Sequence, residues 1–259
     1  TIVESKERIL PSEDYEISKV LVKAFKSRNI SIETSSTVSS IEIDKKVCTR
    51  IDDKNINSEL VLVSIGVKGN YKQVIGSMDI EIKDNHVSTN NYMQTNYDNI
   101  YAIGDLSGPP WLAHVASAEG VLAIEHLSNK KCTPIDYSSI PGCTYTQPEV
   151  ASIGLTETQA INQGYDVKIG RFPLSASGKA MAISSTTGFA KAIIEKKHGE
   201  ILGFHMIGEG VTELVSEIVM AKSLEATAED IIRIVHPHPT ISEIIPEVFS
   251  VSLDEPIHI

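Results

Sequence analysis

The sequence predicts an α/β region followed, from about residue 140, by an α+β region. Residues 60–65 form a largely apolar run followed by a glycine, which is typical of a buried parallel strand. A second apolar segment, residues 100–103, leads into Gly104 and Asp105. Further on, residues 189–195 and 200–207 have the pattern of two antiparallel strands joined by a short turn, which favours an α+β arrangement there.

The composition is that of an ordinary globular protein. The chain has 259 residues, of which 41% are hydrophobic, and a formal net charge of -11. No apolar run approaches the roughly 20 residues needed to cross a bilayer, and no signal peptide is recognisable. Nucleic acids are bound by clustered Lys and Arg, so the negative charge argues against them as partners. We expect a cytoplasmic protein with neither nucleic acid nor membrane as a partner.

The cysteines are few. Cys48, Cys132 and Cys143 form no Cys-x-x-Cys or similarly short pair. An odd and sparse count favours a reducing compartment over a disulfide-stabilised scaffold.

The N-terminal residues 1–4 have the pattern of a strand that ends in a carboxylate, Glu4. The chain opens on Thr1 rather than Met, so we expect a fragment of a longer protein. A Rossmann unit places an acidic residue at the end of its second strand, where it binds a ribose. Glu4 fits that position, but no Gly-rich loop precedes it, and a solvated strand end is the alternative.

The next elements are a helix and a group of strands. Residues 17–29 have apolar side chains at helical spacing and predict an amphipathic helix. Strands are expected near residues 30–33, 36–44 and 46–51, followed by a turn at 52–55. The glycine that ends the apolar run at 60–65 is Gly66, and it would let a ligand approach the backbone.

Asp105 follows the second apolar segment at the position where open α/β sheets bind ligands. Its carboxylate could accept hydrogen bonds from a sugar alcohol, or it could be a plain turn residue. A helix is expected from about 113 to 127. The free N–H groups at a helix start favour negative charge. Trp111 could equally be a core aromatic residue and His114 a helix cap.

A polar segment, residues 132–139, predicts a domain boundary. Beyond it we expect strands at 140–146, 150–155 and 167–172. Thr156 and Gln159 have the spacing of a capping box and predict a short helix there. The remaining expected elements are the hairpin at 189–207, a helix that begins at 210–211 and a short helix at 228–234.

The segment His236-Pro237-His238-Pro239 is stiffened by its two prolines. Thr240 to Glu243 then has the spacing of a capping box ahead of an apolar run. A histidine can take and return a proton near neutral pH, and a carboxylate on its other nitrogen would fix the tautomer. Three interpretations stay open: His238 and Glu243 as an acid/base pair, Glu243 as a helix cap only, or the two histidines as metal ligands.

Three motifs in this order resemble the pyridine nucleotide-disulfide oxidoreductases. They are the strand-end glutamate, Thr95 followed by Ala102-Ile103-Gly104-Asp105, and His-Pro-Thr-x-x-Glu near the C-terminus. The resemblance covers essentially the whole chain. It implies a partial Rossmann-type NAD domain at 1–67, a central FAD-contacting domain at 68–137 and an α+β dimerisation domain at 138–259.

The resemblance also implies site residues. His238 would accept the proton, Glu243 would orient it, and the His238-Pro239 peptide bond would be cis. The residues expected to contact FAD are Asp105, Trp111, Leu112, Ala113 and His114. The residues expected at the NAD site are Glu4, Val38 and Gly66. No residue is assigned to a metal.

The activity that the resemblance implies is the oxidation of dihydrolipoamide by NAD+ through FAD and a redox disulfide. The Ser242-Glu243-Ile244 sequence fits the lipoamide-oxidising branch better than glutathione reductases. A homodimer is implied, with a lipoyl domain of a 2-oxoacid dehydrogenase complex as its partner. The alternatives are glutathione reductase, mercuric reductase, a transhydrogenase or a non-catalytic dimerisation module. The 259 residues contain no Cys-x4-Cys pair and no Gly-rich loop, so this chain alone is expected to be inactive and to bind FAD poorly.

Overall fold

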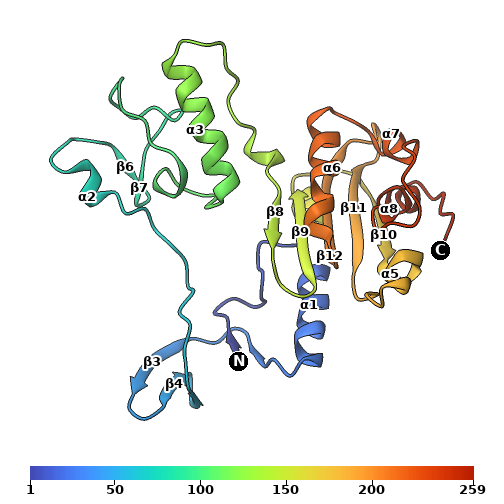
Figure 1. Ribbon diagram of the computed structural model, residues 1–259, viewed down its shortest axis with the longest axis horizontal. Coiled ribbons are helices and arrows are strands. Elements are labelled where there is room, and N and C mark those ends of the chain that lie inside the picture. The colour runs from blue at the N-terminus through green and yellow to red at the C-terminus, as the bar shows by residue number, and fades with distance from the viewer. The chain divides into compact units, whose positions relative to one another are not determined.

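The computed structural model describes all 259 residues, which separate into two compact units. The first unit comprises residues 1–61 and 138–259, and the second comprises residues 62–137. Figure 1 shows the larger sheet and its helices in the first unit, and α3 (Ala113–Leu127) in the second. None of the helices has the length and apolar character that a bilayer span requires.

The first unit is built around a five-stranded antiparallel sheet with the order β10-β11-β12-β9-β8. Its central strand, β12, is buried along its whole length. The strands predicted after residue 140 and the hairpin between β11 and β12 are confirmed. The bounds are β8 (Gly142–Thr144), β9 (Glu149–Gly154), β10 (Val167–Pro173), β11 (Phe189–Glu195) and β12 (Ile201–Gly208).

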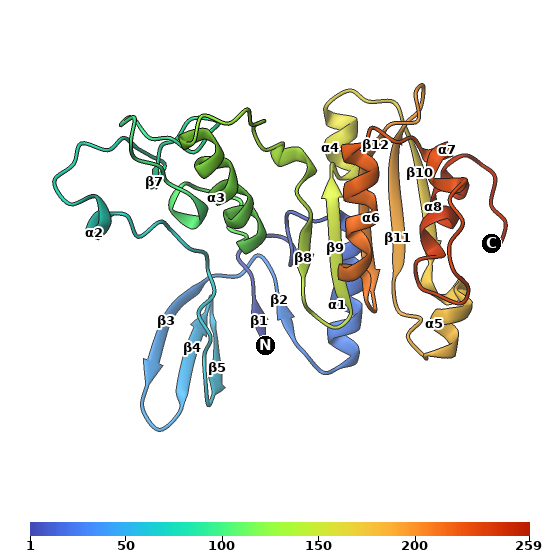
Figure 2. The ribbon, with the colours of Figure 1, turned by 45° about the horizontal axis from the view of Figure 1, so that its top comes forward.

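Helices cover both faces of this sheet. Ala151 and Met206 pack in one hydrophobic cluster with α6 (Val211–Ser223) and α8 (Ile244–Ser252). Their neighbours Val150 and Ile207 pack instead with α1 (Tyr15–Ser27). Successive side chains of a strand point to opposite faces, so α1 covers one face and α6 and α8 cover the other. Figure 2 shows these helices against the sheet.

Short helices complete the unit. The capping box predicted at Thr156 and Gln159 is confirmed and opens α4 (Glu157–Asn162). A second capping box, between Thr227 and Asp230, opens α7 (Ala228–Ile232). The other short helices are α5 (Gly178–Ala182) and the 3-10 turn η3 (Leu174–Ala176), and the 3-10 turn η2 (Tyr137–Ser139) includes the last residue of the second unit.

The N-terminal segment carries two small sheets. β1 (Ile2–Val3) and β2 (Ile32–Glu33) pair in parallel on either side of α1 in the chain. β3 (Val38–Ile43), β4 (Val47–Ile51) and β5 (Lys54–Ser58) form an antiparallel sheet. The sequence did not predict β5, whose polar residues have low strand propensity.

The prediction of a buried parallel strand at residues 60–65 is wrong. This segment is extended but belongs to no sheet, and Leu62 and Ile65 are 91% and 93% exposed. An apolar run becomes a buried parallel strand only where neighbouring strands pair with its backbone and other elements cover both faces. No strand pairs with this run, so it remains exposed.

The second unit contains α2 (Lys72–Ile75), β6 (Ile82–Lys83), β7 (His86–Val87), the 3-10 turn η1 (Gly104–Leu106) and α3. The predicted helix at 113–127 is confirmed by α3. The predicted buried strand ahead of Gly104 is wrong, because only an isolated bridge between Gln94 and Tyr101 forms there. The Thr95 hydroxyl donates to the Ile100 carbonyl at 2.9 Å and closes the chain into a tight turn instead of a strand.

Candidate active site

The structure brings His238 and Glu243 together. Nδ1 of His238 lies 2.8 Å from Oε1 of Glu243, and the imidazole is 77% exposed. The other carboxylate oxygen of Glu243 accepts the backbone N–H of Thr240 at 2.8 Å. A carboxylate can only accept here, so Nδ1 of His238 carries a proton, and in the neutral ring the lone pair is on Nε2. The arrangement leaves an accessible proton acceptor on an oriented ring.

The Glu243 carboxylate is kept ionised by its partners. Partial burial on its own would raise the pKa of Glu243, but the Thr240 N–H and the His238 ring hydrogen-bond to the charged form and hold its pKa below the ordinary value. A charged carboxylate in turn stabilises an imidazolium at His238. This pairing is the geometry that general acid/base catalysis by histidine requires.

The helix start predicted at Thr240 forms only in part. Glu243 reaches back to the Thr240 N–H as a capping box requires, but α8 begins at Ile244, and Glu243 occupies its N-terminal cap position. The Thr240 hydroxyl donates to the Pro237 carbonyl at 2.7 Å and so does not cap the helix. The cis peptide bond expected between His238 and Pro239 is confirmed.

His236 has a different environment. Its side chain is 6% exposed; Nε2 lies 2.8 Å from Oε1 of Glu217 and Nδ1 lies 3.1 Å from the Ile234 carbonyl. Both ring nitrogens are therefore engaged within the chain. No group of three His, Cys, Asp or Glu side chains in the structure could hold a metal ion. The geometry gives His236 a structural role and does not support the pairing of His236 with His238 as metal ligands.

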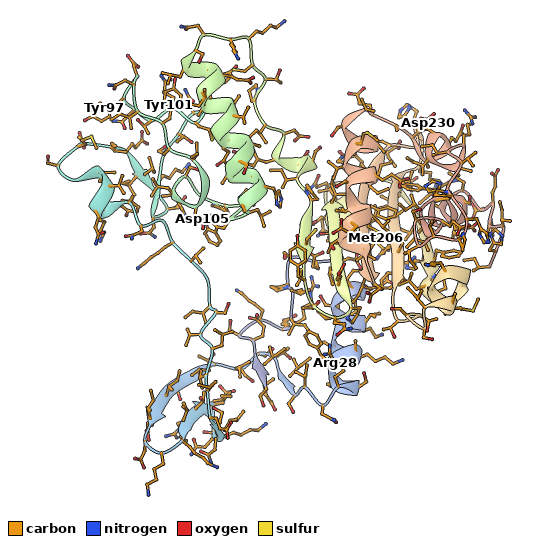
Figure 3. All side chains as sticks on the ribbon, viewed as in Figure 1. Arg28, Tyr97, Tyr101, Asp105, Met206 and Asp230 are labelled. Atoms are coloured by element: carbon orange, nitrogen blue, oxygen red, sulfur yellow. The ribbon has the colours of Figure 1, made fainter.

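The residues predicted to contact FAD gather on η1 and the start of α3. Asp105, labelled in Figure 3, is exposed on η1 and has no hydrogen-bond partner within the chain. Gly104 before it has a φ of 66°, and a Cβ there would lie 3.1 Å from the Ala116 side chain. A glycine is thus needed both for the turn and for its close packing on α3.

The N-cap residue of α3 has no polar side chain and makes no side-chain cap hydrogen bond. Leu112 is the cap residue and lies in extended conformation, so the first N–H groups of α3 meet no side-chain acceptor from Leu112. Trp111 is 40% exposed, and its ring lies 5.9 Å from that of His86, so it is not a buried core aromatic. Ala113 and His114 form the exposed first turn of the helix.

The residues predicted to bind NAD are divided between the units. Glu4 follows β1, and one of its carboxylate oxygens accepts the Lys6 N–H at 2.8 Å. Val38 begins β3 and is 41% exposed. Gly66 belongs to the second unit, has a φ of 121° and is exposed.

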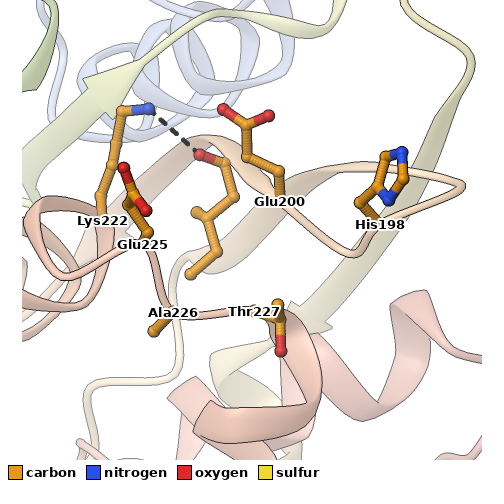
Figure 4. A pocket seen from close by; sticks show the side chains of 7 residues that line it. His198, Glu200, Lys222, Glu225, Ala226 and Thr227 are labelled. Atoms are coloured by element: carbon orange, nitrogen blue, oxygen red, sulfur yellow. Dashed lines mark hydrogen bonds between the residues drawn. The ribbon is translucent and has the colours of Figure 1, made fainter.

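A hollow of about 340 Å³ lies between the β11–β12 turn and the end of α6 (Figure 4). The Lys222 ammonium donates to the Ile201 carbonyl at 3.2 Å there, so it supports the backbone. None of the predicted site residues lines this hollow. Its lining consists of His198, Glu200, Ile201, Lys222, Glu225, Ala226 and Thr227.

A buried ionic cluster lies under α1 and was not predictable from the sequence pattern. The Lys191 side chain is 1% exposed, and its ammonium contacts carboxylates of Asp14, Glu16 and Glu157 at 2.6–2.9 Å. Arg171 also contacts Glu16 and Glu157. The one signal in the sequence is a lysine inside an otherwise apolar strand, β11. The cluster joins α1 to the sheet and to α4.

Comparison with known families accounts for most of the chain. A family model described as pyridine nucleotide-disulphide oxidoreductase matches residues 1–120. A second one, described as the dimerisation domain of the same proteins, matches residues 140–249. The first match spans Glu4, Val38, Gly66 and the residues predicted to contact FAD, and the second spans the pair of His238 and Glu243.

Two curated relatives are named dihydrolipoyl dehydrogenase. The protein of Zymomonas mobilis is 40% identical over 255 residues, which cover 95% of this chain and 55% of that protein. The protein of Bacillus subtilis is 39% identical over 266 residues, covering 100% of this chain and 56% of that protein. The chain therefore spans about half the length of the curated relatives it matches.

Solved structures share the fold. LpdA from Mycobacterium tuberculosis matches with a TM-score of 0.89 at 23% identity, over 95% of this chain and 55% of that one. The HOCl-induced flavoprotein disulfide reductase RclA from Escherichia coli matches with a TM-score of 0.91 at 20% identity, over 96% of this chain and 58% of that one. The two family matches, together with these relatives, show that the chain belongs to the pyridine nucleotide-disulphide oxidoreductase family.

Proposed function

We propose that these residues serve a dihydrolipoyl dehydrogenase, which oxidises dihydrolipoamide with NAD+ through FAD and a redox disulfide. The observation that carries the proposal is the 2.8 Å contact between Nδ1 of His238 and Oε1 of Glu243. The names of the curated relatives support the choice of substrate.

His238 acts on thiol protons in this proposal. Its Nε2 takes a proton from one thiol of dihydrolipoamide, because the thiolate and not the thiol attacks a disulfide. The thiolate would attack one sulfur of the redox disulfide, break its S–S bond and release the other sulfur as a thiolate. The second substrate thiol would then attack the substrate sulfur of this mixed disulfide and displace the enzyme sulfur, so that lipoamide leaves as the cyclic disulfide. Two protons and two electrons pass from the substrate to the redox disulfide. Glu243 stabilises the imidazolium that forms at His238 and holds its ring in place.

FAD is the cofactor that the second unit suits. The exposed Asp105 carboxylate has no partner in the chain and could accept hydrogen bonds from ribityl hydroxyls. Residues 111–114 would lie beside the flavin, where the positive end of the α3 dipole favours negative charge. Bound there, FAD would carry two electrons from the dithiol to NAD+.

For NAD we propose Glu4, Val38 and Gly66. The Glu4 carboxylate uses one oxygen for the Lys6 N–H and has the other available for a ribose hydroxyl. Val38 and Gly66 are exposed and small enough to let the nucleotide approach the backbone. We retain the division into an NAD-binding part at 1–67, a FAD-contacting part at 68–137 and a dimerisation part at 138–259.

Partners follow from the same proposal. The disulfide on which His238 acts belongs to the other subunit of the homodimer, and a two-fold interface gives two such sites. The dithiol arrives on a lipoyl domain of a 2-oxoacid dehydrogenase complex. The three cysteines are free, as the proposed reducing cytoplasm requires.

The experiment is a chimera in which these 259 residues replace the matching part of the Bacillus subtilis relative. The chain alone contains no Cys-x4-Cys pair, and we expect no lipoamide turnover from it. The chimera is expected to bind FAD and to reduce NAD+ with dihydrolipoamide, but to leave glutathione disulfide and mercuric ion unreduced. A folded chimera that prefers either of these, or robust turnover by the chain alone, would contradict the proposal.

A further inference from the structure

Glu119 is a buried carboxylate for which the proposed reaction has no use. It lies in the middle of α3 and is 4% exposed. Its neighbours on the buried side of the helix are apolar, namely Val115, Leu122 and Ala123. A charged group in such surroundings is costly unless each of its oxygens has a partner, so its contacts decide its role.

Both oxygens of Glu119 have a donor. Oε2 accepts the backbone N–H of Gly104 at 2.6 Å, and Oε1 accepts the hydroxyl of Tyr137 at 2.6 Å. Hydrogen bonds to a charged acceptor are short and about twice as strong as those between neutral groups. Glu119 therefore holds two segments that are far apart in the sequence.

The first of these segments is η1, which carries Asp105. The carbonyl of Gly104 is held as well, because it accepts the N–H of Ser107 at 2.8 Å and its hydroxyl at 2.9 Å. Both ends of the Gly104 residue are thus fixed, one by Glu119 and the other by Ser107. Asp105 follows immediately, and its direction depends on the peptide that Glu119 anchors.

The second segment is the end of the second unit. Tyr137 is the last residue of this unit, and Ser138 begins the return to the first. Partial burial raises the pKa of the Tyr137 phenol, and the hydrogen bond to Glu119 and its charge raise that pKa further. Tyr137 therefore stays protonated and donates to Glu119 at all physiological pH values.

We propose that Glu119 is a positioning residue that fixes η1 so that the Asp105 carboxylate is presented to the ribityl chain of FAD. The inference rests on the proposed role of Asp105. Glu119 itself does not touch the cofactor, since it is buried and both its oxygens are occupied by the chain. Its contribution to FAD affinity is made through the Gly104 N–H.

The test uses the chimera with the Bacillus subtilis relative, labelled at its carboxyl carbons and amides, and FAD as the probe. The Gly104 amide of the chimera without substitutions is expected to resonate far downfield and to exchange slowly, since it donates to a buried carboxylate. The Asp105 carboxyl signal is followed while FAD is added. A change in this carboxyl signal reports contact between FAD and Asp105 and does not depend on enzyme turnover.

Three variants separate positioning from plain stability. Glu119→Leu removes both acceptors but keeps an apolar side chain of similar size, so the Gly104 and Asp105 signals should move and the Kd for FAD should rise about tenfold, as for one lost buried hydrogen bond. Glu119→Gln keeps an acceptor for the Gly104 N–H, and its Kd should stay within about threefold. Glu125→Leu, at the other glutamate of α3, should leave the signals and the Kd unchanged.

The proposal is overturned if Glu119→Leu leaves the Asp105 signal and the FAD affinity unchanged, or if Glu119→Gln loses as much affinity as Glu119→Leu. If Glu119→Leu does not fold, the Gly104 amide of the protein without substitutions is the test. Fast exchange of this amide and an ordinary chemical shift would contradict its hydrogen bond to Glu119 and overturn the proposal. An Asp105 signal that ignores FAD refutes the flavin role of Asp105, while the variant signals still report whether Glu119 holds η1.

Discussion

Nδ1 of His238 lies 2.8 Å from Oε1 of Glu243, and these two residues differ sharply in how firmly the fold holds them. The imidazole is 77% exposed, whereas Glu243 directly precedes α8. The buried residues of α8 are among the best protected in the chain: Ile244, Ile245, Val248 and Phe249 are at most 1% exposed. An accessible proton acceptor is thus oriented by a carboxylate fixed to the hydrophobic core.

Close packing of α8 on β10 should therefore be essential for the pair. A Cβ on Gly170 would lie 1.9 Å from the Val248 carbonyl. Gly170→Ala is expected to lower the free energy of unfolding by about 1–3 kcal/mol, as overpacking does, and to shift the His238 ring signals in NMR spectra. Gly178→Ala is the control, because a Cβ there meets nothing within 4 Å. Equal urea midpoints for the two variants would refute this packing argument.

The titration of Glu243 offers a second prediction. Burial raises the pKa of Glu243, but the Thr240 N–H and the His238 ring lower it by more, so it lies below the ordinary value. The contribution of this carboxylate to stability is present above the unfolded-state pKa and is lost as pH falls through the lower folded value. In His238→Gln the pKa of Glu243 should rise while the contact with Thr240 remains. Carboxyl NMR across the acid range measures this, and an unchanged pKa would count against the pairing.

The buried ionic cluster predicts a large loss of stability on mutation. Lys191→Met leaves the carboxylate of Asp14, whose side chain is 3% exposed, without its cation. Removing one partner of a buried pair costs about 3–5 kcal/mol. Lys196→Met is the matched control, because it breaks the ion pair of Lys196 with Asp166, whose two side chains are 55% and 73% exposed. Such exposed ion pairs contribute about 0–1 kcal/mol to stability. Urea unfolding compares the two, and similar losses would contradict the account.

Acid should reveal the role of Arg171 in the same cluster. Its bidentate hydrogen bond is the largest cause that lowers the pKa of Glu16, from 4.5 to about 2; burial opposes this and Lys191 assists it. Because the folded pKa is depressed, the stability that Glu16 provides is present above about pH 4.5 and is lost as pH falls towards about 2.

Arg171→Gln should bring the pKa of Glu16 closer to its ordinary value. Its free energy of unfolding should then fall less steeply with acid than that of the unchanged chain. Arg233→Gln is the control, since its pair with Glu229 is 75% and 69% exposed. Parallel acid profiles for the unchanged chain and Arg171→Gln would show that Arg171 does not set this pKa.

Local features of the fold were predictable from the sequence. The bounds of α3 and the capping box at Thr156 depend on residues within a few positions of one another. The contact between His238 and Glu243 is also local, since prolines restrict the backbone of the five positions that join them. The three motifs that indicated the family are likewise made of residues close together in the sequence.

Features that depend on distant residues were not predictable. Residues 60–65 have the composition of a buried strand, but a strand needs partners that the pattern cannot reveal. The cluster around Lys191 joins residues up to 177 positions apart. The sequence shows Glu119 as a glutamate among the apolar residues of one helix face, which indicates a buried carboxylate. Its partners Gly104 and Tyr137 lie outside the helix and could not be predicted from this pattern.

The most direct measurement of the central claim is the rate of NAD+ reduction by dihydrolipoamide in the chimera with the Bacillus subtilis relative. His238→Gln is expected to lower this rate by about 10²–10⁴-fold, the range for losing a general acid/base, and Glu243→Gln by less. His198→Gln, at an exposed histidine outside the site, should leave the rate unchanged. A His238→Gln chimera that binds FAD and turns over as fast as its parent would contradict the account.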